Sequence, residues 1–266
     1  MSSLGERIQV LVKGPQFAWW MGHVLLLICT IFYLPYWATF HFRAGAHWYT
    51  RAFLGAILSY GVVVYKSFPE IQFNSQFFQA MLTEENTLYF LMAIYWWRST
   101  PMLAPLIPYV VFAIFNALTY VRTNILSLAS GDAAAAQASG PAKTIESLVD
   151  KYHNPAMSAV ALFEITGVMG SLVFWALTFQ SSFFSPILYA FFLRFRYFFN
   201  PYTRTAFTQL RARLDGLVLN NPKVPPQALK AYGIAQRALV QFGRAAVQQP
   251  GTQADPASTP VPAPAQ

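Results

Sequence analysis

The strongest constraint on the fold is a run of apolar residues from Phe17 to Leu34, long enough to cross a bilayer as a helix. Only 11% of the 266 residues are charged, whereas soluble domains carry about 25%. Long apolar runs in a chain with so few charges indicate an integral membrane protein. We therefore expect an all-α, polytopic helical membrane protein.

The N-terminal run shares some features with a secretory signal peptide. Arg7 and Lys13 precede it, and Ala44-Gly45-Ala46 resembles a cleavage site. However, the run is longer than the roughly 7–15 apolar residues of a signal peptide. The small residues also follow well after its end. We therefore expect a retained first span over Phe17–Phe40.

The next apolar segments are short or interrupted. Trp48–Tyr65 predicts a second hydrophobic helix, in which Gly55 and Ser59 are four residues apart and allow close helix packing. Asn86–Trp97 is too short to cross alone, because a span needs about 20 residues. With Pro101–Val121 it forms either a re-entrant hairpin or two tilted crossings.

More polar segments separate the remaining hydrophobic ones. Lys66–Thr87 has an amphipathic pattern that predicts an interfacial helix. Residues 122–152 indicate a polar loop, with a flexible low-complexity part at about 130–143 and a short helix after it, suggested by Thr144, Glu146, Leu148 and Val149. Asn154-Pro155 is expected to open a helix that runs through Gln180, and Phe183–Phe199 predicts the last hydrophobic helix.

The C-terminal quarter changes character. Asn200-Pro201 is typical of an N-cap followed by a first-turn proline, so a new helix is expected to start there. The stretch from about Gln227 to Gln248 contains no acid and predicts a basic amphipathic helix. We predict a helical membrane domain over residues 1–199, basic amphipathic cytosolic helices over 200–249 and a disordered Pro/Ala-rich tail over 250–266.

The cations are expected to mark the cytosolic membrane surface. A net charge of +8 fits this better than nucleic-acid binding, for which the sequence has no recognised motif. Long cationic side chains flanked by aromatic residues suit the headgroup layer, where the stem stays in oil. We expect contacts with anionic lipids or a partner from nine residues: Arg194, Arg196, Arg204, Arg211, Lys230, Arg237, Leu239, Phe242 and Arg244.

Nothing in the sequence predicts a catalytic, cofactor or metal site. His41 and His47 flank one loop, but without the HxxxH or HExxH spacing of a zinc site. No GxSxG elbow and no glycine-rich phosphate loop occurs. Glu84-Glu85 favours either a helix N-terminus or a partner contact.

Glu164 is the one acid deep in an apolar helix. An intramembrane carboxylate is a functional candidate by default. The simpler interpretation is a buried polar residue that locks helix packing, either protonated or paired with Arg194 or Arg196. The alternative is a small membrane transporter or a membrane-embedded lipid enzyme that uses Glu164 with His41 and His47.

Three stretches also carry a resemblance to known sequences. They are Tyr49–Ala52, Phe68–Leu91 and Pro186–Arg211, and the last contains Asn200-Pro-Tyr-Thr-Arg-Thr205. They are similar to the transmembrane protein 33 family of endoplasmic-reticulum and nuclear-envelope membrane proteins, which includes fungal pore-membrane nucleoporins. Glu164 also lies where that family has an acidic residue in an apolar helix.

The resemblance implies a non-enzymatic, multi-pass protein that organises the membranes of the endoplasmic reticulum and nuclear envelope. Such a protein would shape membrane or support the assembly and distribution of nuclear pore complexes. The implied partners are the lipid bilayer, reticulon-like proteins, nucleoporins and an importin. A plain adaptor, whose basic C-terminal part recruits a soluble partner, is a further hypothesis.

The distribution of cations predicts the topology. Half of the 18 lysines and arginines lie from Arg194 onward, which predicts a cytosolic C-terminus. Arg7 and Lys13 place the N-terminus on the same side, so the number of crossings should be even. Tags at both ends should be digested when protease is added to sealed microsomes. Protection of the C-terminal tag would overturn the orientation.

Overall fold

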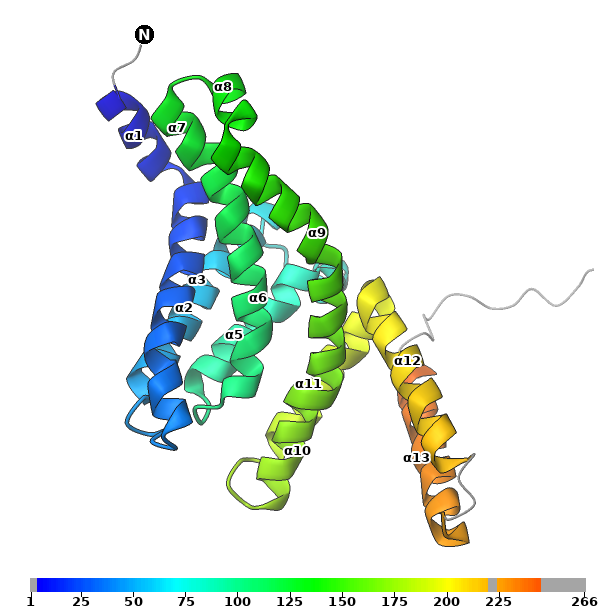
Figure 1. The fold of residues 1–266 in the computed structure, drawn as a ribbon. Coiled ribbons are helices and arrows are strands. Elements are labelled where there is room, and N and C mark those ends of the chain that lie inside the picture. Colours follow the sequence, from blue (N-terminus) through cyan, green and yellow to red (C-terminus); the bar gives the residue numbers. More distant parts are fainter. Residues whose placement is uncertain (1–3, 220–223, 245–266) are drawn as a thin grey trace, which may run out of the picture. The chain divides into compact units, whose positions relative to one another are not determined.

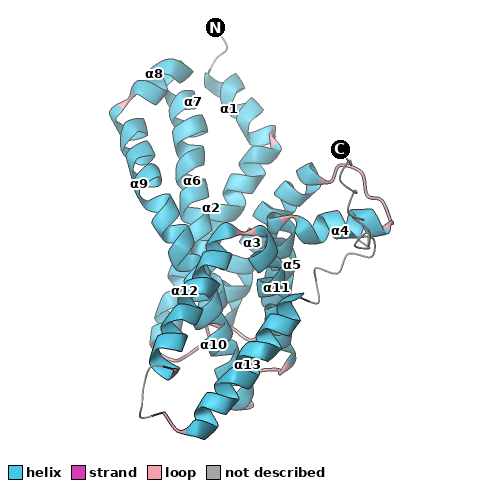
Figure 2. Cartoon of the chain, turned by 90° about the vertical axis from the view of Figure 1, so that its right-hand side faces the viewer, coloured by secondary structure: helices cyan, strands magenta, loops and turns pink. Residues whose placement is uncertain are grey.

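A computed structural model describes residues 4–219 and 224–244, and every regular element in these ranges is a helix (Figures 1 and 2). The predicted all-α class of a polytopic membrane protein is thereby confirmed. The chain forms two compact units, Met1–Leu210 and Arg211–Gln266. The division falls inside a helix, later than the domain boundary predicted at residue 200. The predicted tail at 250–266 lies outside the described residues.

The helices follow one another through short connections. In chain order they are α1 (Leu4–Lys13), α2 (Pro15–Ala38), α3 (Ala46–Ser67), α4 (Ser75–Thr83), α5 (Glu85–Arg98), α6 (Leu103–Tyr120), the π-helix η1 (Val121–Ile125), α7 (Leu126–Ser130), α8 (Ala133–Ala138), α9 (Gly140–Phe163), the π-helix η2 (Glu164–Val168), α10 (Met169–Leu177), α11 (Phe184–Phe199), α12 (Pro201–Val218) and α13 (Pro226–Arg244).

Three helical stretches in the described ranges are long and apolar enough to cross a membrane: Pro15–Ala38, Leu106–Ser130 and Gly140–Leu177. Helix α3 has 22 residues but is less apolar. Helices α5 and α11 have 14 and 16 residues, which gives about 21 and 24 Å at 1.5 Å per residue. Both fall short of a hydrocarbon core of about 30 Å, as expected for short hydrophobic helices.

Part of the secondary structure differs from the sequence prediction. The expected loop at 122–152 is mostly helical, and the predicted start at Asn154-Pro155 is wrong, because α9 begins 14 residues earlier, at Gly140. Ser139 caps that start by accepting from the backbone N–H of Ala142, so Pro155 lies inside the helix. The predicted interfacial helix within Lys66–Thr87 is also shorter, since α4 starts only after the Asn74 cap.

Helices α2 and α3 form a tight antiparallel hairpin (Figure 1). Its close approach centres on Gly22 and Gly55. A Cβ atom on Gly22 would lie 2.3 Å from Ser59 Oγ and 2.6 Å from the Gly55 carbonyl oxygen. The Ser59 hydroxyl donates to the carbonyl oxygen of Trp19 at 2.8 Å. The spacing of Gly55 and Ser59 in the sequence therefore marks a true helix–helix contact.

Aromatic rings fill the centre of the membrane unit. Tyr89 of α5 has ring neighbours on three other helices: Tyr60 at 5.6 Å, Tyr109 at 5.4 Å and Phe192 at 5.3 Å between centroids. Edge-to-face contacts such as those to Tyr109 and Phe192 stabilise beyond simple area burial. This ring cluster joins α3, α5, α6 and α11 and surrounds the polar site described below.

Substitution of the hairpin glycines tests the packing of α2 on α3. Gly22→Ala and Gly55→Ala should each destabilise the protein by about 1–3 kcal/mol, because the added Cβ meets backbone atoms that cannot rotate away. Gly170→Ala is the matched control, since nothing lies within 4 Å of its Cβ position. Thermal unfolding in detergent measures the difference. Equal melting temperatures for all three variants would contradict the close packing.

Candidate functional site

Two charged side chains are buried among the described residues, Glu164 at 0% and Arg196 at 3% exposure. Arg196 Nη2 lies 3.0 Å from Glu164 Oε2. A buried charge without a partner is strongly unfavourable, and more so in a bilayer, where no bulk water competes. The ion pair therefore explains how both charges can remain inside the unit.

Tyr89 contacts both members of the ion pair. Its hydroxyl donates to Glu164 Oε1 at 2.5 Å, and Arg196 Cζ lies 5.0 Å from the centroid of its ring. A guanidinium over an aromatic face gains electrostatic attraction from the ring. Tyr109 in turn donates its hydroxyl hydrogen to the Tyr89 carbonyl oxygen at 2.9 Å. Tyr89 thus fixes the carboxylate and the guanidinium together.

A second carboxylate completes the cluster, which we call the Glu164 network. Arg196 Nη1 donates to Glu85 Oε1. Asn200 Nδ2 reaches both oxygens of Glu85, at 3.2 and 3.1 Å. Asn200 Oδ1 also accepts from the backbone N–H of Thr203 at 3.0 Å, so the predicted N-cap of α12 is confirmed. The network consists of Glu85, Tyr89, Glu164, Arg196 and Asn200.

The network ties together helices that are distant in sequence. It joins α5, η2, the end of α11 and the first residue before α12. Glu164 opens the π-helix η2, and π-turns within α-helices occur frequently at functional sites. On α11 the buried residues recur at helical spacing, and Arg196 follows Tyr189, Phe192 and Leu193 on that face.

Arg196 corrects one prediction of the sequence analysis. A place at the membrane surface was expected, with a pair with Glu164 as the alternative. The side chain is buried and paired with Glu85 and Glu164, so the pairing is confirmed and the surface position is wrong. The periodicity of α11 carried a signal for this position, because Arg196 falls on the buried stripe. Glu85 was recognised only as a residue at a helix start or a partner contact. Glu84 in fact caps α5, accepting from the Thr87 N–H at 2.6 Å.

The space around the network is small. A cavity of about 10 Å³ lies against Glu164, Tyr89 and Tyr109. Such a volume holds about one water molecule. His41 and His47 are exposed at the α2–α3 connection, where the His47 ring contacts Tyr36 and Trp48. No set of three potential metal-ligating His, Cys, Asp or Glu side chains occurs in the described ranges.

The other predicted surface residues lie further along the chain. Arg194 is half-buried and Arg204 is exposed on α12. In the second unit Arg211, Lys230 and Arg237 are exposed, Leu239 is 66% exposed and Phe242 is half-buried. Arg244 ends α13, but its side chain lies outside the described part of the structure.

Within the second unit, α12 and α13 are joined by a polar contact. Asp215 Oδ1 accepts from the Tyr232 hydroxyl and from Gln236 Nε2, both at 2.7 Å. The hydrogen bond to Asp215 raises the pKa of Tyr232, because ionisation would remove the donated hydrogen. Large apolar side chains on the two helices, and Leu219 directly after α12, stay exposed: Leu214, Leu217, Leu219, Leu229, Ile234, Leu239 and Val240.

Comparison with known proteins matches residues 5–243 to the family model for transmembrane protein 33/nucleoporin POM33. Tetra-spanning protein 1 of Schizosaccharomyces pombe is 31% identical and covers 92% of this chain and 90% of its own length. Nucleoporin POM33 of Chaetomium thermophilum is 32% identical, covering 90% of this chain and 89% of its own. Human transmembrane protein 33 is 26% identical over 76% of this chain and 79% of its own length. No solved structure matches the chain.

Removing one charge at a time tests the network. Arg196→Met should lower the free energy of unfolding by about 3–5 kcal/mol, because Glu164 is left buried without its cation. Glu164→Gln should lower the free energy of unfolding less, because Arg196 keeps its ion pair with Glu85. Expression and localisation should be unchanged. The double variant should be more stable than Arg196→Met alone. Unfolding in detergent, followed by tryptophan fluorescence, measures these differences.

Arg204→Met is the control for the loss of an arginine, because this side chain is exposed. Its effect should stay within about 0.5 kcal/mol. If Arg196→Met and the double variant were equally destabilised, the two charges would not be coupled and the network would lose its central interaction.

Proposed function

The chain belongs to the transmembrane protein 33/nucleoporin POM33 family, and from this premise we propose that it is a non-enzymatic membrane-organising protein of the endoplasmic reticulum and nuclear envelope. Its role would be to shape membrane, to support the assembly and distribution of nuclear pore complexes, or both. The names of two relatives, nucleoporin POM33 and pore membrane protein of 33 kDa from Saccharomyces cerevisiae, support the pore-linked part.

The observation that carries this proposal is the closed Glu164 network. The buried acid is paired with Arg196 and hydrogen-bonded to Tyr89, and the adjoining cavity is about 10 Å³. A substrate pocket normally has a volume of about 300–1,000 Å³. Glu164, the acid best placed for transport or catalysis, is therefore better suited to stabilising the helix packing. This argues against the transporter or lipid-enzyme alternative.

Unequal helix lengths support a role in membrane shape. Helices α5 and α11, at 14 and 16 residues, are shorter than a full crossing. The 9-residue helix α4 precedes α5 and has exposed phenylalanines, Phe73 and Phe78, at or near it. Segments that fill one leaflet more than the other expand that leaflet and favour curvature. We propose that these short helices do so here.

The second unit adds a surface suited to lying on a bilayer. Leu239 is 66% and Leu217 is 66% exposed, which is unfavourable in water but favourable at the acyl boundary. Lys230 and Arg237 are exposed, and with Arg244 they repeat every seven residues. Each cation near an anionic surface contributes about 1 kcal/mol. We propose anionic lipids as the partner of this surface, with both chain termini cytosolic.

The topology and the further partners also belong to the proposal. The name of the S. pombe relative, tetra-spanning protein 1, supports an even number of crossings. Reticulon-like proteins, nucleoporins and an importin are the proposed protein partners, and nucleic acid is not among them. If α13 binds a soluble protein rather than lipid, the second unit is an adaptor that recruits this partner, and the hypothesis that it lies on the membrane surface is wrong.

Reconstitution of the full chain into liposomes of mixed neutral and anionic lipid tests the proposal. The protein should convert large vesicles into smaller or tubular ones, visible by electron microscopy, without ion flux or lipid turnover. Leu239→Asp should weaken this effect, because it places a charge on the apolar face of α13. Gln241→Asp adds the same charge on the cationic face, so its smaller loss measures the electrostatic part alone, and Leu239→Asp should exceed it because the apolar contact is lost as well.

High salt should reduce the effect, since it screens the cations from lipid phosphates. Substrate flux or turnover with unchanged vesicle shape would contradict the membrane-organising role and favour the transporter or enzyme alternative.

A further inference from the structure

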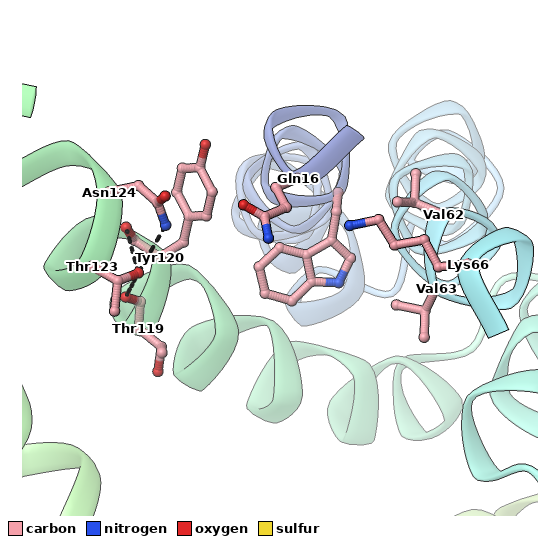
Figure 3. A pocket seen from close by; sticks show the side chains of 9 residues that line it. Gln16, Val62, Val63, Lys66, Thr119, Tyr120, Thr123 and Asn124 are labelled. Atoms are coloured by element: carbon pink, nitrogen blue, oxygen red, sulfur yellow. Dashed lines mark hydrogen bonds between the residues drawn. The ribbon is translucent and has the colours of Figure 1, made fainter. Parts of the chain in front are cut away.

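A groove lies between the ends of three membrane helices that meet at one end of the first unit. It has a volume of about 290 Å³ and is lined by the start of α2, the end of α3, and the end of α6 with η1 (Figure 3). Because α2 and α3 are antiparallel, the first turn of one and the last turn of the other reach the same level. The groove therefore opens at one face of the membrane domain.

Each helix contributes a polar residue at the outside and an apolar or aromatic residue about one turn deeper. The pairs are Gln16 and Trp19 on α2, Lys66 and Val62 on α3, and Asn124 on η1 with Tyr120 on α6. Figure 3 shows the Lys66 side chain extending across the groove toward Gln16. This polar rim over an apolar floor matches the boundary between lipid headgroups and acyl chains.

The charge at the rim is not neutralised. Lys66 is exposed and forms no ion pair with any carboxylate in residues 4–219 and 224–244. By contrast, the nearby cation Arg122 is paired with Glu146 at 2.5 Å. Around the rim, the Gln16 amide adds a hydrogen-bond donor, and so does the second hydrogen of the Asn124 amide, whose first is donated to Thr123 Oγ1 at 2.8 Å. An anionic group with several acceptor oxygens complements this set.

A second observation points to a polar ligand. The hydroxyl of Tyr120, a lining side chain only 3% exposed, has no hydrogen-bond partner within the described chain. A buried hydroxyl without a partner costs roughly 1–3 kcal/mol, so such groups normally find an acceptor or donor. A headgroup oxygen in the groove would supply one.

We propose that this groove binds one anionic glycerophospholipid, with its phosphate at Lys66 and the first part of an acyl chain against Trp19, Val62 and Val63. The volume is below that of a pocket for a whole drug-sized ligand, which suits a lipid whose remaining chains stay in the bilayer. The site is separate from the Glu164 network and does not depend on the proposed membrane-shaping role.

Photocrosslinking of the full chain in lipid nanodiscs tests the site. A phosphatidylserine probe with a diazirine near the start of one acyl chain should label peptides from the start of α2 and the end of α3. The matching phosphatidylcholine probe should label them several-fold less, because its headgroup carries no net charge. Mass spectrometry of the wild-type protein gives this map without any substitution.

Two variants identify the contacts. Lys66→Glu should lower groove labelling by phosphatidylserine about fivefold or more, the size expected for one cation at an anionic lipid. Lys13→Glu is the matched control, since Lys13 is an exposed lysine in the last turn of α1 and does not line the groove. Val63→Trp should lower labelling by both probes, because it fills the apolar floor.

Three results would overturn the proposal. The first is equal labelling of these peptides by the two probes, and the second is equal labelling of the Lys66→Glu and Lys13→Glu proteins. The third is labelling spread evenly over all lipid-facing helices. Unchanged size-exclusion profiles establish that the variants are folded, and the wild-type map remains decisive if one is not.

Discussion

The ion pair between Arg196 and Glu164 is the interaction on which the membrane unit depends. Each group alone would be a charge in a medium that cannot solvate it, whereas together they lie 3.0 Å apart. Arg196 lies over the ring of Tyr89, and the Tyr89 hydroxyl donates to Glu164. The gain from pairing two buried charges is often small, whereas breaking the pair is costly. The pair therefore mainly determines which helix arrangement is stable, because any arrangement that separates α11 from η2 leaves two uncompensated charges.

This requirement explains how the short helices are held. Helix α11, with 16 residues, gains little from crossing the bilayer alone. Its arginine is satisfied only where η2 supplies Glu164 and α5 supplies Glu85. The same contacts fix α5, the other short helix, since Glu85 and Tyr89 are one turn apart on it. Two segments too short to be independent spans are thereby locked to the long α9–η2–α10 stretch.

The features that local sequence determines were predictable, and those that depend on distant contacts were not. Apolar runs gave the positions of α2, α3, α6 and α11, because membrane insertion is decided segment by segment. The cap at Asn200 and the close approach at Gly55 were also local signals. Arg196 was given two alternative positions, at the membrane surface and in a pair with Glu164, because an arginine among phenylalanines suits both a headgroup position and a buried pair. The choice depends on Glu164, which is 32 residues away in the chain.

The start of α9 was missed because Asn154-Pro155 has the composition of a helix start, whereas the cap at Ser139 lies in a stretch of low complexity.

The stretches that carry the family resemblance meet in this network. Glu85 and Tyr89 come from the stretch ending at Leu91, and Arg196 and Asn200 come from the stretch beginning at Pro186. The specific part of the sequence therefore encodes a buried, charge-paired core, while the lipid-facing features lie elsewhere. The two lipid-facing features, the groove and the exposed side chains of α12 and α13, differ in what they recognise. A groove with one unpaired lysine saturates when one headgroup is bound, whereas the exposed apolar side chains of α12 and α13 respond to the packing and charge of the whole surface. Binding at the groove should consequently follow lipid chemistry at low lipid-to-protein ratios, and binding through α13 should follow surface charge density and curvature.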